Sequence, residues 1–308
     1  MKNNRRDITG IVLVNKPKGV SSNRVLQQVK RLYHAQKAGH TGNLDPMATG
    51  LLPICLGKAT RIAQYLLDTD KTYQATMTLG SLTDTADAEG QVIEQQTNLP
   101  LLTTSQINQA LASFQTTLSQ VPPMYSALKY QGKPLYELAR QGIEVPRKAR
   151  TITIHSLQLV DHYSDHITFN VTCSKGTYVR TLAVDIGQWL DRYAYLSALH
   201  RTHCGPLAID QAIDLPSLEQ LSQPQRDQWL LSPETPFQHT PIYQIADADF
   251  RPFWQYGRLP NTGYDGIVRL YNPSGIFMAL GYCQQGVLQY KTIFNHPHSD
   301  QSLNHHGP

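Results

Sequence analysis

The segment GHTGNLDPMATG, residues 39 to 50, holds the residue types of this chain that best suit chemistry. Asp45 is its single carboxylate and stands directly before a proline. Asp-Pro is a common helix start, with aspartate as N-cap and proline as the first helical residue. The three glycines of the segment let a ligand approach the backbone closely, and His40 lies five residues away. From these residues alone, Asp45 is either a helix cap or a catalytic carboxylate.

A second candidate group is KGTYVRT, residues 175 to 181, where a strand is predicted to pass into a helix. Tyr178 and Arg180 are two residues apart and point the same way if the strand continues. An arginine beside a buried carboxylate keeps it ionised, lowers its pKa and fixes its rotamer. The alternative is a tyrosine packed in the core and an arginine on the surface.

Other catalytic and ligand-binding patterns fit poorly. The fragment GKAT at residues 57 to 60 is not a P-loop, because Ala59 stands where serine or threonine is required. The four cysteines lie far apart without paired spacing, which argues against a zinc site and a disulfide framework. The acids nearest to Asp45, Asp68 and Asp70, lie beyond a predicted helix. We therefore expect Asp45, if catalytic, to be the sole carboxylate, and we expect no metal and no cofactor.

The charge distribution favours a phosphate-bearing partner more than the net charge of +4 does. Residues 1 to 61 hold eleven lysines and arginines against two aspartates. Residues 129 to 150 hold six basic residues against two glutamates. Such local excess suits nucleic acid, and a solvated basic surface explains it equally well.

Length and composition set the class of protein. A chain of 308 residues suggests one large domain and a smaller one, and 40% hydrophobic and 16% charged residues are typical of a soluble globular protein. No apolar run approaches the roughly 18 residues that span a bilayer. The first ten residues lack the apolar core of a signal peptide. We expect a cytoplasmic protein without a membrane segment.

The predicted elements must position these residues. Apolar patterns predict strands at residues 8–14, 72–79, 150–160 and 166–173, the second beginning near Tyr73. Helical spacing predicts helices after the serines at 21–22, at 60–68, after a capping box of Thr103 and Gln106, and at 178–190. Because these do not alternate as regular βαβ repeats, we do not expect a doubly wound parallel sheet. The expected fold is α+β, with a mixed, largely antiparallel sheet flanked by helices.

The remaining segments are connections and a smaller unit. The acidic loop at residues 83–90 is predicted to be a solvated connection, and residues 121–150 an excursion from the sheet. Short strands beyond the prolines near 233–236 predict a separate β unit. We expect a catalytic domain at 1–236, a β domain at 237–295 and a disordered tail at 296–308.

Several segments together resemble the TruB family of tRNA pseudouridine synthases. They are VNKPKGVSS, GHTGNLDPMATGLLPICLGKATR, DKTYQA, VPPMYSALKYQGKPLYELARQG, CSKGTYVRTLAVDIG and LHRTHCGPL. They cover most of residues 8 to 215 in the right order, and the last 70 or so residues resemble more loosely the small PUA-like β domain of these enzymes. The resemblance implies the pseudouridine synthase fold.

The resemblance also implies a function. It implies isomerisation of uridine 55 in the tRNA T-loop to pseudouridine, with the T-arm as the bound part of tRNA and without metal or cofactor. We expect a monomer, since no obligate protein partner is implied. Asp45 matches the essential aspartate, usually drawn as the nucleophile, and the excursion 121–150 matches the region that closes on RNA. Five substrate-binding residues carry over from the family. His40 matches the residue that supports the loop when nucleotides flip out, and Tyr73 matches the residue that stacks on the base. Arg180 matches the residue that pairs with the carboxylate, and Tyr178 and Leu199 match pocket positions.

Two rival functions stay open at this point. A non-catalytic RNA binder on the same scaffold would not require Asp45, Tyr73 and Arg180 together. A glycoside or nucleoside hydrolase that uses Asp45 would release the free base.

Overall fold

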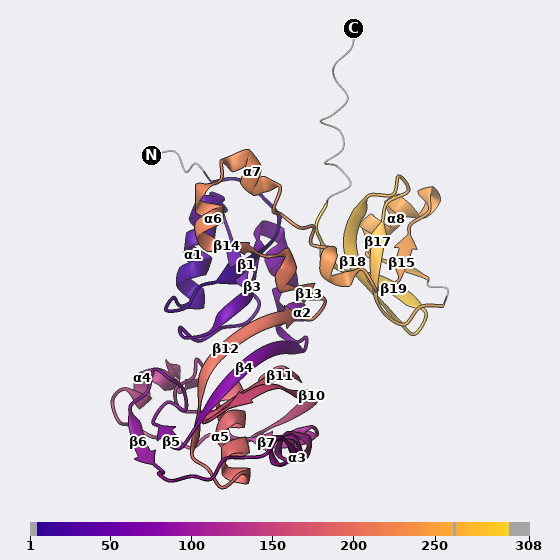
Figure 1. Cartoon of the computed structure of the whole chain (residues 1–308). Helices are drawn as coiled ribbons and strands as arrows, with labels where there is room; N and C mark the ends of the chain where they lie inside the picture. Colours follow the sequence, from indigo (N-terminus) through magenta and orange to yellow (C-terminus); the bar gives the residue numbers. More distant parts are fainter. Residues whose placement is uncertain (1–4, 261–262, 296–308) are drawn as a thin grey trace.

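The computed structural model describes residues 5–260 and 263–295 as two β-sheet units with their helices (Figure 1). The predicted tail at 296–308 lies outside these residues. The strands of the large sheet are β1 (Gly10–Lys16), β2 (Ala38–His40), β3 (Thr49–Leu56), β4 (Lys71–Leu79), β7 (Thr117–Gln120), β10 (Arg150–Tyr163), β11 (His166–Cys173), β12 (Ala194–Cys204), β13 (Leu207–Ala208) and β14 (Ile213–Asp214).

The large sheet is mixed and mostly antiparallel. Its order is β14-β1-β3-β12-β4-β11-β10-β7, with β2 paired to β3 and β13 to β12. Only the β1–β14 and β3–β12 pairs are parallel. The expected α+β class with a largely antiparallel sheet is therefore confirmed.

Helices and smaller elements complete this unit. They are α1 (Ser22–Leu32), the 3-10 helix η1 (Gly57–Ile62), α2 (Ala63–Leu67), β5 (Ser81–Thr83), β6 (Val92–Gln95), α3 (Thr104–Phe114), β8 (Lys129–Tyr130), β9 (Lys133–Pro134), α4 (Leu135–Ala139), α5 (Val179–Trp189), η2 (Ile209–Gln211), α6 (Leu215–Gln220), α7 (Gln223–Asp227) and η3 (Thr235–Phe237). The predicted helix at 60–68 is instead a 3-10 turn followed by one short α-helix.

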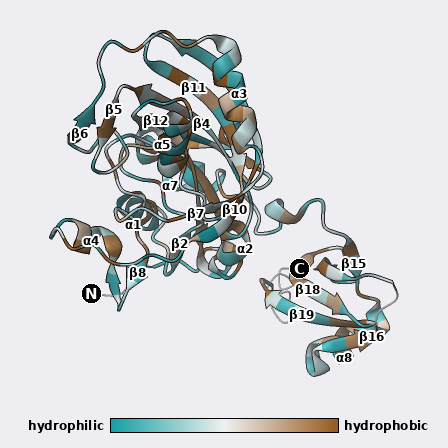
Figure 2. Ribbon diagram, turned by 90° about the horizontal axis from the view of Figure 1, so that it is seen from below, coloured by the Kyte–Doolittle hydropathy of each residue, from teal (hydrophilic) through white to brown (hydrophobic). Residues whose placement is uncertain are grey.

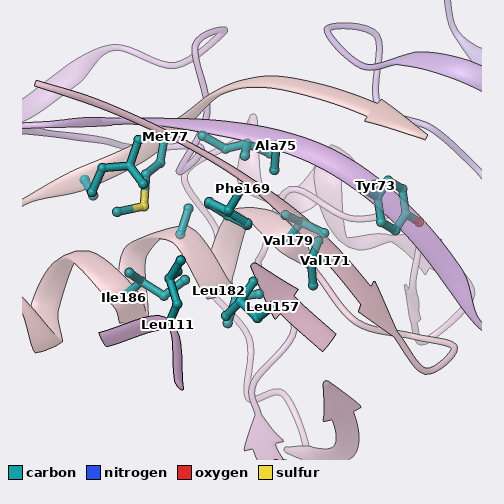
Figure 3. Close-up of a cluster of buried hydrophobic side chains, with 14 of the residues drawn as sticks. Tyr73, Ala75, Met77, Leu111, Leu157, Phe169, Val171, Val179, Leu182 and Ile186 are labelled. Carbon is teal, nitrogen blue, oxygen red and sulfur yellow. The ribbon is translucent and has the colours of Figure 1, made fainter. Parts of the chain in front are cut away.

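The main core lies between the central strands and two helices. Tyr73, Ala75 and Met77 of β4 are buried at every second position, as period-2 strands require. They pack with residues of β11, α3 and α5, shown in Figure 3. The alternate face of β4 is polar, and its Thr72 and Thr76 hydroxyls lie 3.0 Å from those of Thr172 and Thr168 on β11.

Side-chain caps fix where the helices begin. Ser21 caps α1, with its hydroxyl accepting from the Arg24 backbone N–H. Thr103 and Gln106 form the predicted capping box at the start of α3. The buried apolar faces follow from there, with Val25 and Val29 in α1 and Ile107 and Leu111 in α3.

Residues 121–149 form an insertion between β7 and β10. It carries the β8–β9 hairpin and α4, and it packs around its own small core of Leu135, Leu138 and Val145. The sequence pattern had no steady period here because the turns and the short helix change direction every few residues.

The C-terminal unit is a curled five-stranded sheet in the order β15-β17-β18-β19-β16, which fits the PUA-like domain expected from the sequence. Its elements are β15 (Ile242–Gln244), α8 (Asp247–Tyr256), β16 (Arg258–Pro260), β17 (Gly266–Tyr271), β18 (Phe277–Gln284) and β19 (Val287–Ile293). The helix α8 had no counterpart in the sequence prediction, because proline interrupts its pattern at position 252. Figure 2 shows this unit as a lobe beside the larger body.

The two units share an apolar cluster and hydrogen bonds. Phe237, Phe277 and Phe294 pack with residues of β1, β3 and η1. Lys58 Nζ donates to the Phe294 carbonyl at 3.0 Å, and Arg61 Nη1 donates to the Ile293 carbonyl at 2.6 Å. These two residues, which belong to the basic excess of residues 1–61, therefore join the two units.

Candidate active site

One cavity of about 270 Å³ brings together residues from four parts of the large unit. Most of them come from the loop between β2 and β3, from β4 and β12, from the turn before α5 with the first residues of that helix, and from the insertion, and Leu67 of α2 lies beside them. Five of the six predicted site residues line it, namely Asp45, Tyr73, Tyr178, Arg180 and Leu199. These five residues are up to 154 positions apart in sequence. The pairing of β12 and β4 brings Leu199 and Tyr73 together, and the Arg180–Asp45 ion pair joins α5 to the loop between β2 and β3.

The Asp45 loop is held by contacts on both sides of the carboxylate. Leu44 and Ala48 are buried in the main core. The Leu44 N–H donates to Ser22 Oγ at 2.8 Å, and that hydroxyl donates to the Leu44 carbonyl at 3.0 Å. Lys16, fully buried, donates to the Pro46 carbonyl at 3.2 Å. The flanking backbone is thus fixed while the Asp45 side chain faces the cavity.

No helix begins at Asp45, so the capping interpretation is wrong. Residues 46–47 form a turn, closed by the Ala48 N–H donating to the Asp45 carbonyl at 3.1 Å, and β3 starts at Thr49. The Asp-Pro pair was misleading because a proline also suits the second position of a tight turn.

Arg201 fixes the same loop from β12. Its guanidinium is fully buried and donates from Nε to the Leu51 carbonyl at 2.7 Å and from Nη2 to the Gly42 carbonyl at 3.3 Å. Gly50 has φ +102, and a Cβ there would lie 2.4 Å from the Arg201 carbonyl oxygen. Only glycine fits this crossing, where β3 and β12 are parallel neighbours.

Arg180 joins Asp45 to a second acid. Its Nε lies 2.9 Å from Oδ2 of Asp45, and its Nη1 lies 3.3 Å from Oδ2 of Asp87. Nη1 also donates to the Thr85 carbonyl at 3.1 Å, and Nη2 to the Tyr125 carbonyl at 2.7 Å. Arg180 is the second residue of α5, not a strand residue, so it does not share a strand face with Tyr178 as the sequence suggested.

Asp87 corrects the prediction made for its loop. The loop 83–90 is not simply solvated, because backbone bonds between Leu196 and the residues flanking Asp87 fasten it to β12. Asp87 is buried and accepts from the Thr85 hydroxyl at 2.6 Å and the Glu89 N–H at 3.0 Å. Asp87 is a second carboxylate on Arg180, but it does not line the cavity, so that Asp45 is the sole catalytic carboxylate stays a prediction. The small residues Ala86 and Ala88 around Asp87 were the only sequence sign of close packing.

The electrostatics of the pair also differ from the expectation. Burial raises the pKa of Asp45 above its ordinary value, and the nearby Asp87 raises it further, while Arg180 opposes the shift. Arg180 lowers the pKa of Asp45, in the direction expected of it, but the loss of hydration outweighs the ion pair and the net shift is upward. Burial lowers the pKa of the neighbouring Lys16 to about 8.

Tyr73 and Leu199 form the inner wall of the cavity. Tyr73 stands at the end of the apolar core, and Figure 3 shows its hydroxyl pointing away from the cluster. Burial raises the pKa of Tyr73 to about 12, which keeps the phenol protonated at neutral pH. Leu199, from β12, is packed against the same core.

His40 is the one predicted site residue outside the cavity lining. It ends β2, and its Nδ1 accepts from the Gly42 N–H at 3.4 Å. Burial, and next the charge of Arg201, lower the pKa of His40. It thus contacts the Asp45 loop as a neutral side chain, without reaching the cavity itself.

Residues 5–260 and 263–295 contain no group of three or more histidine, cysteine, aspartate or glutamate side chains placed to hold a metal ion. Within the same ranges, no helix is long and apolar enough to cross a membrane.

Comparison with known proteins identifies the family. The model of the TruB family pseudouridylate synthase, N-terminal domain, matches residues 30–179. The chain is 46% identical over 296 residues to tRNA pseudouridine synthase B of Francisella philomiragia, covering 96% of this chain and 98% of the relative. It is 47% identical, with the same coverage, to the protein of that name from Francisella tularensis subsp. novicida. The chain belongs to the TruB family of pseudouridylate synthases.

Solved structures agree with the fold of this TruB family member. A chain of a Cbf5-Nop10-Gar1 complex superposes with a TM-score of 0.71 at 24% identity, over 93% of this chain and 85% of that one. A chain of an archaeal box H/ACA sRNP Nop10-Cbf5 complex gives 0.69 at 20% identity, over 95% and 89%. At these identities the likeness concerns the fold alone.

Proposed function

We propose that this TruB family isomerase converts uridine 55 in the T-loop of tRNA to pseudouridine, with Asp45 as the catalytic carboxylate. The observation that carries the proposal is the Arg180–Asp45 pair, 2.9 Å apart, in a cavity with room for one nucleoside. The curated relatives named tRNA pseudouridine synthase B support tRNA as the substrate.

The reaction exchanges one glycosidic bond for another. The N1–C1′ bond breaks, the uracil ring turns over, the C5–C1′ bond forms, the proton at C5 leaves, and N1 takes up a proton. A carboxylate at C1′ can capture or stabilise the positive charge that develops there, or it can remove a proton at C2′ in a glycal route. Asp45 suits either role, because Arg180 holds it as an oriented anion.

The neighbours of Asp45 have roles in this proposal. A base stacked within the T-loop cannot turn over, so the target nucleotide flips into the cavity at a cost of a few kcal/mol. The ring of Tyr73 stacks on the uracil, and Tyr178 and Leu199 complete the pocket. His40 supports the RNA loop from outside the cavity, and the insertion 121–149 closes on the RNA.

The insertion is suited to that task by its contacts. Its Tyr125 carbonyl accepts from Arg180 Nη2, and Ser126 and Ala127 line the cavity. Lys129, Lys133 and Lys148 are exposed on it and have no side-chain hydrogen bond or ion pair within the described ranges. Such lysines can contact backbone phosphates.

The test is to incubate unmodified tRNA transcripts with the protein and map pseudouridine by sequencing. We expect modification at position 55 and no free uracil by chromatography. A protein that binds the transcript without modifying it would be the non-catalytic RNA binder, and release of free uracil would identify a hydrolase. Pseudouridine at another position would contradict the proposed target.

A further inference from the structure

Tyr178 is held at its backbone by one side chain from β7. Gln120, which is buried, donates from Nε2 to the Tyr178 carbonyl at 3.1 Å and accepts at Oε1 from the Tyr178 N–H at 2.8 Å. A single amide group therefore satisfies both peptide groups of a residue that precedes the first turn of α5. This pairing fixes the direction in which the Tyr178 side chain leaves the backbone.

The ring of Tyr178 is covered by the residue paired with Gln120 across the sheet. Arg150 and Gln120 are register partners in the β7–β10 ladder. The central guanidinium carbon of Arg150 lies 5.7 Å from the centroid of the Tyr178 ring, a cation–π distance. In the described ranges Arg150 has no carboxylate partner, whereas Lys175 nearby is paired with Asp68 at 2.8 Å.

The turn before Tyr178 leaves space for this guanidinium. Gly176 has φ +81, and a Cβ there would lie 3.1 Å from Arg150 Nη1. A side chain at position 176 would thus be strained in its backbone and would crowd the arginine.

Gln120 and Arg150 also mark the two ends of the insertion. The chain leaves the β7–β10 ladder after Gln120 and returns to it at Arg150. The residues that hold Tyr178 are therefore the residues from which the insertion projects.

We propose that Gln120 and Arg150 are positioning residues that clamp Tyr178 in the orientation the substrate nucleoside requires. Gln120 holds its backbone, and Arg150 holds its ring. The clamp makes the placement of Tyr178 depend on how the insertion is seated, so that the pocket is complete when the insertion is closed on RNA. This inference rests on the proposed function, in which Tyr178 contacts the flipped nucleoside.

The test measures kcat, KM and the Kd for tRNA for Arg150→Gln, Arg150→Lys and Gln120→Glu. Arg150→Gln should lower kcat about tenfold, in line with the cost of misplacing a pocket group, while the Kd for tRNA stays within a few fold. Arg150→Lys keeps the charge without the planar fork and should be intermediate. Gln120→Glu keeps the acceptor for the Tyr178 N–H but loses the donor, and should also lower kcat. The matched control is Lys291→Gln, which removes a cation–π contact of 5.1 Å with the Tyr282 ring in the C-terminal unit, away from the cavity, and should keep the wild-type kcat.

A double-mutant cycle separates positioning from a general structural role. In a Tyr178→Leu background, Arg150→Gln should have no further effect on kcat, because the ring that it positions is gone. A full tenfold effect in that background would overturn the clamp. So would a rise in Kd or KM with kcat unchanged, since Arg150 would then be an RNA contact.

The failure of the clamp and the failure of the proposed function have different signatures. If Tyr178→Leu alone turns over at the wild-type rate, the clamp has no purpose and the inference fails, while the isomerase proposal stands. If wild-type protein forms no pseudouridine, the proposed function fails whatever the variants do.

Discussion

The Nε atom of Arg180 lies 2.9 Å from Oδ2 of Asp45, and the remaining contacts of the guanidinium fix its position. Its two terminal nitrogens reach Asp87 and the carbonyls of Thr85 and Tyr125. Arg180 thus ties the Asp45 loop to the 83–90 loop and to the insertion. The aim of the Asp45 carboxylate depends on all three segments.

Replacing Arg180 tests that dependence. Arg180→Ala should lower kcat by about two to three orders of magnitude, because the carboxylate loses its orientation and its neighbouring positive charge. It also leaves Asp87 buried without its partner, which should cost roughly 3–5 kcal/mol of unfolding free energy. Single-turnover kinetics and calorimetric unfolding measure the two effects. Arg180→Lys is the control for stability, and wild-type kcat in Arg180→Ala would contradict the role of the pair.

Asp87 should affect the pH at which activity is lost on the acid side, because it changes the pKa of Asp45. Asp87 raises the pKa of Asp45, so Asp87→Asn should lower it. Catalysis requires the ionised carboxylate and is lost as pH falls through its pKa. The acid limb of kcat/KM in Asp87→Asn should therefore move to lower pH. Asp68→Asn, at an exposed acid paired with Lys175, should leave the limb unmoved, and an upward shift in Asp87→Asn would contradict the coupling.

The ring and the hydroxyl of Tyr73 should contribute separately. Tyr73→Phe keeps the stacking surface, so the Kd for tRNA should stay within a few fold. Loss of the hydroxyl should lower kcat about a hundredfold if it transfers a proton in the reaction. Because the pKa of Tyr73 is raised to about 12, wild-type activity should not fall between neutral pH and pH of about 9 through ionisation of this phenol. Equal kcat for Tyr73→Phe and wild type would remove the hydroxyl from the mechanism, and Tyr73→Leu shows the cost of losing the ring as well.

Salt dependence should distinguish the lysines of the insertion from those that join the two units. Replacing Lys129, Lys133 and Lys148 together by glutamine should reduce the slope of log Kd against log salt concentration by about two, since each phosphate contact contributes somewhat less than one. Lys58→Gln is the matched control, because Lys58 is hydrogen-bonded to the Phe294 carbonyl. An unchanged slope in the triple variant would show that these three lysines do not contact RNA phosphates.

The central elements were predictable because their signals are local. The alternation at 72–79 and 166–173 marks strands with one face in the core, and the Thr103–Gln106 capping box marks a helix start. Five of six site residues carried over from the family meet in one cavity. Whether each acts as the resemblance implies stays a prediction.

What the sequence did not reveal depends on tertiary contacts. The sequence predicted a solvated acidic loop around Asp87. Asp87 is buried because its loop pairs with β12 and its carboxylate pairs with Arg180, and neither contact is visible in the local sequence. Lys58 and Arg61 were counted in the basic excess of residues 1–61, but both side chains donate to backbone carbonyls of the C-terminal unit. The raised pKa of Asp45 follows from its burial, and burial cannot be deduced from an Asp-Pro dipeptide.

The most direct test of the account is the release of tritium from tRNA whose uridines carry the label at C5. Formation of the C5–C1′ bond expels that label, so wild-type protein should release one equivalent per tRNA from position 55. Asp45→Asn should release none while binding the same tRNA within a few fold of the wild-type Kd. Release by Asp45→Asn at the wild-type rate would contradict the claim that Asp45 is the catalytic carboxylate.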